Sequence, residues 1–329
     1  MFKKVLAPVA LGIASVFAMD AVSANDYILN TASTGGTYHP VGTAIATLSK
    51  IKLLPTEKFS LTAVNSAGSG ANVQAMAAGT AQFAIVQGLY GSYASTGTGP
   101  ITEKQENMRS ITMLWQNVEQ FILANEHVST GTVSDLVAAT GKTMAMGKEN
   151  SGTLGSNTVL LEGLGVDIAS YELMHAGYGP SVDAMANGQV VGAGMPSGPP
   201  TSAVTKLLSS NGDKFTLLNV TEDEAAKMDN GRNLWVPYTI AAGTYPGQDA
   251  DVQTIAQPNF LAVNADVDEN HVYLLTKTIF ENLPFLQAIH KATNAMDSAK
   301  AMGGLPLPLH PGAAKYYKEI GLEIPAHLM

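Results

Sequence analysis

Four turns in this chain combine glycine with hydroxyl side chains, the residue types that bind small anions. Each turn comes directly after a predicted strand and opens a predicted helix; the turns span residues 33–38, 65–70, 150–153 and 195–199. Glycine lets the backbone approach a ligand closely, and the first N–H groups of a helix have no partner within it. With neighbouring hydroxyl groups, such N–H groups bind carboxylate or phosphate. A single turn of this kind is more often only a capped loop, but four in one chain favour a shared ligand site.

We expect the ligand site to be built from these turns and from the end of one strand. The sharpest expectation concerns the third turn, where Gly152 allows close approach and the hydroxyl groups of Ser151 and Thr153 donate hydrogen bonds to a carboxylate. The first turn is expected to face it from the other half of the chain. The complete set of expected ligand residues is Thr37, Tyr38, Ser66, Gly70, Gln87, Ser151, Gly152, Thr153, Pro196, Ser197 and Gly198.

Motifs of other chemistries are incomplete. Residues 139–143 imitate the end of a phosphate-binding loop, but Leu136 stands where its first glycine is required. Ser197 falls one place too late for the nucleophile turn of a hydrolase. The chain has no cysteine, and its seven histidines show no metal-ligand spacing. We therefore predict no cofactor, no metal and no enzyme activity, while a small-carboxylate hydrolase or isomerase stays open as the alternative. Whether Arg109 or Arg232, the two arginines, contacts the ligand is also left open.

The amino-terminal segment reads as a cleavable export signal. Lys3 and Lys4 precede an apolar run, and the small-residue pattern at positions 22–24 is typical of a signal-peptidase site. Cleavage after Ala24 leaves 16 basic and 26 acidic residues, a net charge of −10. An acidic surface argues against nucleic acid as a partner and is ordinary for an exported protein that must stay in solution. The sequence therefore predicts a periplasmic protein.

Strands and helices alternate along the mature chain, which predicts an α/β protein with mostly parallel sheets. About 305 residues exceed what one hydrophobic core usually supports, so two lobes are expected. Two extended paths, at residues 109–125 and 238–242, are expected to cross between the lobes. We assign residues 25–115 and 250–329 to lobe I and residues 116–249 to lobe II, with the ligand cleft between them.

Six stretches resemble the TAXI family of TRAP-transporter solute receptors, in an order and spacing that cover essentially the whole mature chain. They are residues 33–42 (STGGTYHPVG), 83–87 (FAIVQ), 151–153 (SGT), 198–201 (GPPT), 240–249 (IAAGTYPGQD) and 308–317 (PLHPGAAKYY). The resemblance implies a type II periplasmic-binding-protein fold, in which two lobes close on a ligand. It also implies delivery of that ligand to a TRAP membrane permease driven by an ion gradient.

The resemblance implies a small carboxylate as ligand, either a C4–C5 dicarboxylate or a glutamate-like compound. Three positions depart from the family pattern. Ala71 stands where the family often has glutamate, Gln82 where it often has an acidic residue, and Gly88-Leu89 where it often has Ser-Asp. The missing aspartate removes a partner for a ligand ammonium group, which favours a non-amino dicarboxylate.

Overall fold

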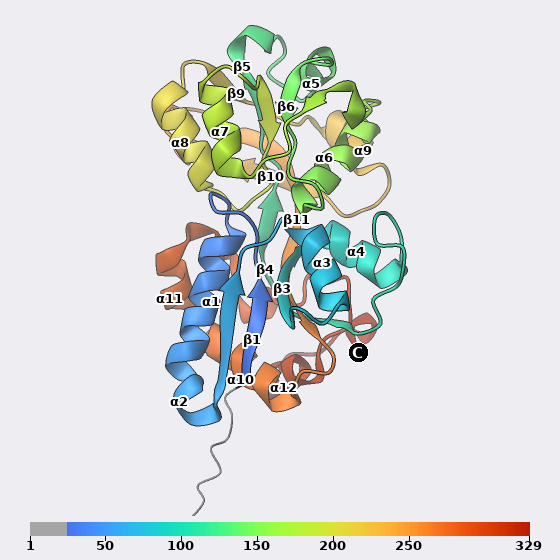
Figure 1. The fold of residues 1–329 in the computed structure, drawn as a ribbon, viewed down its shortest axis with the longest axis vertical. Coiled ribbons are helices and arrows are strands. Elements are labelled where there is room, and N and C mark those ends of the chain that lie inside the picture. The colour runs from blue at the N-terminus through green and yellow to red at the C-terminus, as the bar shows by residue number, and fades with distance from the viewer. Residues whose placement is uncertain (1–24) are drawn as a thin grey trace, which may run out of the picture.

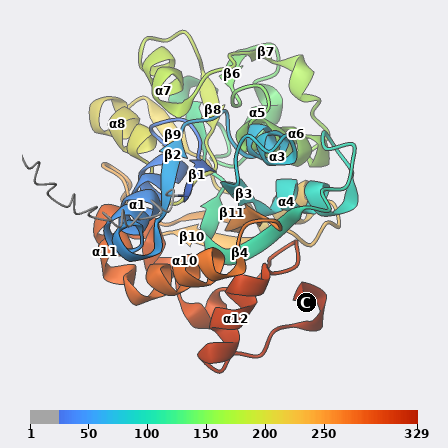
Figure 2. The same ribbon diagram turned by 60° about the horizontal axis from the view of Figure 1, so that its bottom comes forward.

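The computed structural model describes residues 25–329, and the expected export signal lies outside the described residues. Lobe I opens the chain with β1 (Asn25–Asn30), α1 (Tyr38–Lys52), α2 (Leu54–Glu57), β2 (Phe59–Val64), α3 (Ser69–Ala77), β3 (Phe83–Gln87), α4 (Gly88–Thr96) and β4 (Met108–Val118). The chain returns to this lobe with β11 (Val252–Asn264), α10 (Glu269–Glu281), α11 (Leu283–Ile289) and α12 (Pro311–Glu319). Figure 2 shows these last three helices gathered on one side of the lobe.

Lobe II is built from the middle of the chain and sits above lobe I in Figure 1. Its strands are β5 (Phe121–Ala124), β6 (Thr143–Ala145), β7 (Glu172–Leu173), β8 (Gly192–Gly194) and β9 (Phe215–Leu217). Its helices are α5 (Ser134–Ala138), α6 (Gly152–Gly163), α7 (Tyr178–Ala186), α8 (Ser202–Asn211) and α9 (Glu222–Asp229). A further strand, β10 (Val236–Ile240), precedes the return to lobe I.

Each lobe has one sheet, and both sheets are mixed. The lobe I sheet has the order β10-β11-β3-β1-β2, with β4 also paired to β11, and the lobe II sheet has the order β7-β6-β8-β5-β9. Parallel pairs join β1 to β2 and β3, and β6 to β7 and β8. The sheets are therefore less parallel than predicted. The crossing strands β4 and β11, and β5, which follows β4, pair antiparallel with their neighbours.

Two extended strands connect the lobes. β4 runs through lobe I and continues directly into β5 of lobe II. β11 has 13 residues and spans about 40 Å at 3.3 Å per residue. Its first half packs in the lobe II core through Val252 and Ala256, and its second half packs in lobe I through Phe260 and Leu261.

The second crossing is therefore made by β11 rather than by the expected path at 238–242. That path is β10, which pairs antiparallel along the first half of β11. The predicted lobe boundaries at residues 115 and 249 fall within β4 and just before β11, and the boundaries themselves stay a prediction.

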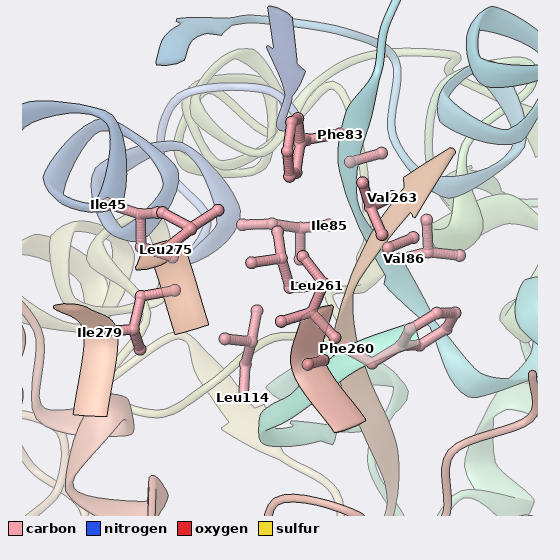
Figure 3. Close-up of a cluster of buried hydrophobic side chains, with 14 of the residues drawn as sticks. Ile45, Phe83, Ile85, Val86, Leu114, Phe260, Leu261, Val263, Leu275 and Ile279 are labelled. Atoms are coloured by element: carbon pink, nitrogen blue, oxygen red, sulfur yellow. The ribbon is translucent and has the colours of Figure 1, made fainter. Parts of the chain in front are cut away.

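The central strands form because their residues are buried on both faces. β3, for example, is an unbroken apolar run ended by Gln87, and all five of its residues are buried. In lobe I the side chains of Ile85 from β3, Leu261 from β11 and Ile279 from α10 lie in one hydrophobic cluster (Figure 3). Burial of each such side chain contributes about 1.5–3 kcal/mol. This packing holds the carboxyl ends of the strands, and the turns that follow them, in fixed positions.

Two hydrophobic clusters stabilise lobe II, one on each face of its sheet. Helices α7 and α8 cover one face through Val182 and Val204, and α6 and α9 cover the other through Leu160 and Met228 (Figure 1). Within residues 25–329, no helix combines the length and the apolar composition needed to cross a membrane. The predicted α/β class, with two lobes and two crossing segments, is confirmed.

Candidate functional site

A small, partly open cavity lies where the turns of the two lobes meet. Its volume is about 40 Å³, room for a few water-sized groups. Lobe I supplies the turns before α1 and α3, the end of β3 and one residue of β4, and lobe II supplies the starts of α6 and α7 and the turn after β8. The lining residues are Ala32, Ser33, Gly36, Thr37, Tyr38, Ala67, Gly68, Ser69, Gln87, Asn117, Gly152, Thr153, Tyr178, Pro196 and Ser197.

Four helices begin at this cavity. The first residues of α1, α3, α6 and α7 are Tyr38, Ser69, Gly152 and Tyr178, and all four line it. A helix N-terminus carries about half a positive charge on its free N–H groups. None of the lining residues has a charged side chain. The cavity is thus electropositive through backbone dipoles alone, which suits a small anion.

Direct hydrogen bonds join the lobes around the cavity. Gln87 Nε2 of lobe I donates to the carbonyl oxygen of Gly152 at 3.0 Å and to Ser156 Oγ at 2.9 Å. Thr37 Oγ1 donates to the carbonyl oxygen of Gly198 at 2.9 Å and accepts from its N–H at 3.1 Å. The backbone N–H of Ala71 donates to the carbonyl oxygen of Asn150 at 2.9 Å. The described conformation is therefore a closed one.

Two buried tyrosines flank the cavity, one from each lobe. The hydroxyl of Tyr38 donates to Asn259 Oδ1 at 2.5 Å. The hydroxyl of Tyr178 donates to the carbonyl oxygen of Pro196 at 2.6 Å and lies 2.8 Å from Thr153 Oγ1. Burial raises the pKa of both phenols far above the usual range, so both are neutral. Each phenol holds its hydrogen-bond partners in place, and neither can act as a general base.

The structure brings seven of the eleven expected ligand residues to the cavity: Thr37, Tyr38, Gln87, Gly152, Thr153, Pro196 and Ser197. The other four lie just outside it. Ser151 caps α6 by accepting the N–H of Leu154 at 3.0 Å, and Gly198 bonds to Thr37 across the lobes. Ser66 donates to the carbonyl oxygen of Thr31 at 2.9 Å, within its own lobe. Gly70 packs against the carbonyl oxygen of Asn150, where only glycine fits. That these residues bind ligand stays a prediction.

Two prominent lining residues were absent from the expected set. Tyr178 begins α7 three residues before the predicted helix start at 181, so the turn at Gly177 is a helix opening that the predicted set does not include. Asn117 belongs to the crossing strand β4, which carries no glycine-rich turn. The one available signal for Asn117 was its place on a predicted crossing strand, which must pass the cleft, but Gln116 beside it on β4 carries the same kind of side chain.

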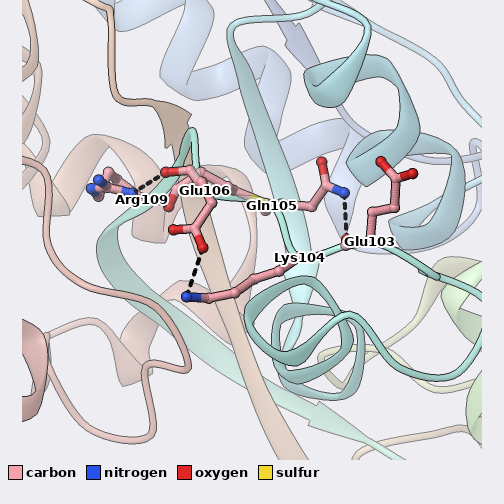
Figure 4. A network of polar contacts seen from close by, with 6 residues as sticks. Glu103, Lys104, Gln105, Glu106 and Arg109 are labelled. Carbon is pink, nitrogen blue, oxygen red and sulfur yellow. Dashed lines mark hydrogen bonds and ion pairs between the residues drawn. The ribbon is translucent and has the colours of Figure 1, made fainter.

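Neither arginine lines the cavity. The Arg109 guanidinium donates to the carbonyl oxygens of Glu106 and Met108, next to the Lys104–Glu106 ion pair (Figure 4). Arg232 donates to the carbonyl oxygen of Asp229 in its own turn. Within residues 25–329, no group of three or more histidine or acidic side chains has the arrangement to hold a metal ion.

Comparisons with known proteins agree with this architecture. A family model described as the NMT1-like family matches residues 29–321. The fold is similar to that of MatC from Rhodopseudomonas palustris with bound malate, at 12% identity over 90% of this chain and 96% of that chain, with a TM-score of 0.54. It is also similar to PhnD1 from Prochlorococcus marinus in complex with methylphosphonate, at 13% identity over 82% and 90% of the two chains, with a TM-score of 0.53. The periplasmic binding protein BugD gives 16% identity over 90% and 93%, with a TM-score of 0.52. The chain thus has the fold of periplasmic solute-binding proteins, as predicted.

Proposed function

The chain belongs to the NMT1-like family, and from that premise we propose that it is the periplasmic solute receptor of a TRAP transporter of the TAXI type. It captures a small carboxylate, a C4–C5 dicarboxylate or a glutamate-like compound, between its lobes and delivers it to the membrane permease. The observation that carries this proposal is the convergence of four helix N-termini on an interlobe cavity whose lining side chains are all neutral.

A carboxylate fits the donors that this cavity offers. Free N–H groups at helix starts and hydroxyl groups such as those of Ser69 and Thr153 donate hydrogen bonds without a cation. An uncharged site of this kind binds and releases an anion without an ion pair that must be broken at delivery. The transport role, the TAXI assignment and the permease partner are further supported by the six sequence stretches of the resemblance.

The alternative is a small-carboxylate hydrolase or isomerase on the same fold. Such an enzyme needs a general base, usually His, Glu or Asp, within hydrogen-bond reach of its substrate. The residues that line the cavity include no such group, and its two phenols are neutral. The receptor is therefore the better-supported function.

The test is a thermal-shift screen over C4–C5 dicarboxylates, amino acids and sugars, with calorimetry on each compound that shifts the melting temperature. A ligand that binds only the folded protein stabilises it by about 2.7 kcal/mol at 100 times its Kd. The expected result is a shift with one or a few carboxylates, each recovered unchanged after incubation. A shift only with sugars would overturn the carboxylate assignment, and appearance of product would favour the enzyme.

A further inference from the structure

Asn117 has a buried acceptor that no protein group uses. Its side chain lines the cavity and is 2% exposed, and its Oδ1 has no hydrogen-bond partner among the described residues. Leaving a buried acceptor unpaired is costly, and such an atom beside a ligand site marks a contact that the ligand completes.

The orientation of the Asn117 amide follows from a chain of hydrogen bonds. The carbonyl oxygen of Gly152 can only accept, so the group that Gln87 directs at it must be Nε2. Gln87 Oε1 then faces Asn117 and accepts from its Nδ2 at 3.2 Å. Since Nδ2 is committed to Gln87, the atom left without a partner is the acceptor Oδ1. The unpaired atom on this cavity-lining residue is therefore an acceptor, and its natural partner is a hydrogen-bond donor.

We propose that Asn117 is a specificity-determining residue, whose Oδ1 accepts a hydrogen bond from a hydroxyl group of the bound carboxylate. This inference rests on the proposed function. A hydroxyl group fits better than an ammonium group, because an ammonium has three donors and a full charge, and no carboxylate lines the cavity. The receptor then selects hydroxy-dicarboxylates over the same diacids without the hydroxyl.

Matched ligand series test this assignment by calorimetry. The C4 series is L-malate, D-malate, succinate and L-aspartate, and the C5 series is 2-hydroxyglutarate, glutarate and L-glutamate. One hydroxy acid is expected to bind about tenfold or more tightly than the parent diacid, because the parent leaves Oδ1 unpaired. Equal affinity for hydroxy acid and parent overturns the role of Asn117, and tighter binding of the amino acid overturns the choice of a hydroxyl group. If no carboxylate binds, the proposed function fails and this inference falls with it.

Variants at Asn117 provide a second test in which each protein serves as its own reference. In Asn117→Ala, the ratio of the Kd of the parent diacid to that of the hydroxy acid is expected to fall to about one, whatever happens to overall affinity or stability. Asn117→Asp places a carboxylate at this point and is expected to shift preference toward the amino acid. The matched control is Gln116→Ala, since Gln116 is the neighbouring residue on β4, has an unpaired Oε1, and lines a different cavity. Its ratio should stay at the wild-type value, and a wild-type ratio in Asn117→Ala would overturn the proposal.

Discussion

The side-chain Nε2 of Gln87 in lobe I donates a hydrogen bond to the carbonyl oxygen of Gly152 in lobe II across 3.0 Å. A Cβ atom on Gly152 would lie 2.6 Å from Gln87 Oε1 and would push this side chain aside. Both residues also line the cavity. Closure of the lobes and formation of the ligand site are therefore one structural event.

Gly70→Ala is expected to block that closure. The added Cβ would lie 2.6 Å from the carbonyl oxygen of Asn150, a backbone atom of the opposite lobe that cannot move aside. Overpacking of this kind costs about 1–3 kcal/mol, which corresponds to a roughly 5- to 150-fold weaker affinity for ligand. Calorimetry measures the affinity, and small-angle scattering should show that ligand no longer reduces the radius of gyration of the variant.

The control for this variant is Gly179→Ala in α7. A Cβ atom there meets nothing within 4 Å, so affinity and compaction should match the wild type. If ligand reduces the radius of gyration of Gly70→Ala as much as that of the wild type, closure of the lobes does not depend on the close contact between Gly70 and Asn150.

Thr153→Ala is expected to weaken ligand binding more than it lowers stability, although it also removes the 2.8 Å hydrogen bond to the Tyr178 hydroxyl, a loss of about 1 kcal/mol. The cap of α6 is Ser151, so removing the Thr153 hydroxyl leaves that cap intact. A hydrogen bond to a charged group is worth about 1.5–3 kcal/mol, and its loss should weaken affinity about 10- to 150-fold. The measurement is Kd by calorimetry, beside the free energy of unfolding in urea.

Thr158→Ala is the matched control for Thr153→Ala. Thr158 lies on the same helix, and its hydroxyl donates to the backbone carbonyl of Leu154 at 2.8 Å rather than facing the cavity. Its affinity should be that of the wild type. Equal affinities in both variants would place the carboxylate elsewhere in the cleft.

Local sequence patterns were sufficient for most of the fold. The predicted helix at 152–163 coincides with α6, because a serine cap and a closing glycine mark both of its ends. The predicted strand at 83–86 lies within β3, since an unbroken run of apolar residues identifies a strand buried on both faces. These signals are local, and they also predicted that glycine-rich turns would meet at one cleft.

Features that depend on long-range pairing could not be predicted in the same way. The second crossing lies in β11 because that strand pairs with β3, β4 and β10 at once, and no local pattern encodes those partners. Asn117 reaches the cavity only because β4 passes the cleft beside Gln87. Sequence patterns find the turns of such a site more readily than the side chains that strands bring to it.

Export with cleavage after Ala24 predicts a mature chain that begins at Asn25. β1 begins at this residue, and its N–H already donates to the carbonyl oxygen of Lys58 at 2.7 Å. Mass spectrometry of the protein from the periplasmic fraction should give the mass of residues 25–329. A soluble cytoplasmic protein that retains Lys3 and Lys4 would contradict the localisation and weaken the transport proposal.

The last prediction concerns Glu119, a carboxyl group buried at the link between β4 and β5. It is 1% exposed, its Oε1 accepts from Trp235 Nε1 at 2.9 Å, and its Oε2 has no partner among the described residues. Burial raises the pKa of this carboxyl group from 4.5 to about 7, and hydrogen bonds from Trp235 and Gln257 only partly oppose the shift.

Because the unfolded chain ionises Glu119 near pH 4.5 and the folded protein near pH 7, the unfolded state binds fewer protons between these values. The contribution of Glu119 to the stability of the fold should therefore fall as pH rises from 4.5 to 7 and level off above that range. Glu119→Gln keeps an acceptor for Trp235 and removes the titration, so its stability relative to the wild type should improve by roughly 3 kcal/mol between pH 4.5 and pH 8. Urea unfolding at pH 5, 6.5 and 8 measures this difference, with exposed Glu103→Gln as the control that should show no such trend. A Glu119→Gln variant that differs from the wild type by the same amount at all three pH values would show that the carboxyl group does not retain its proton in the fold.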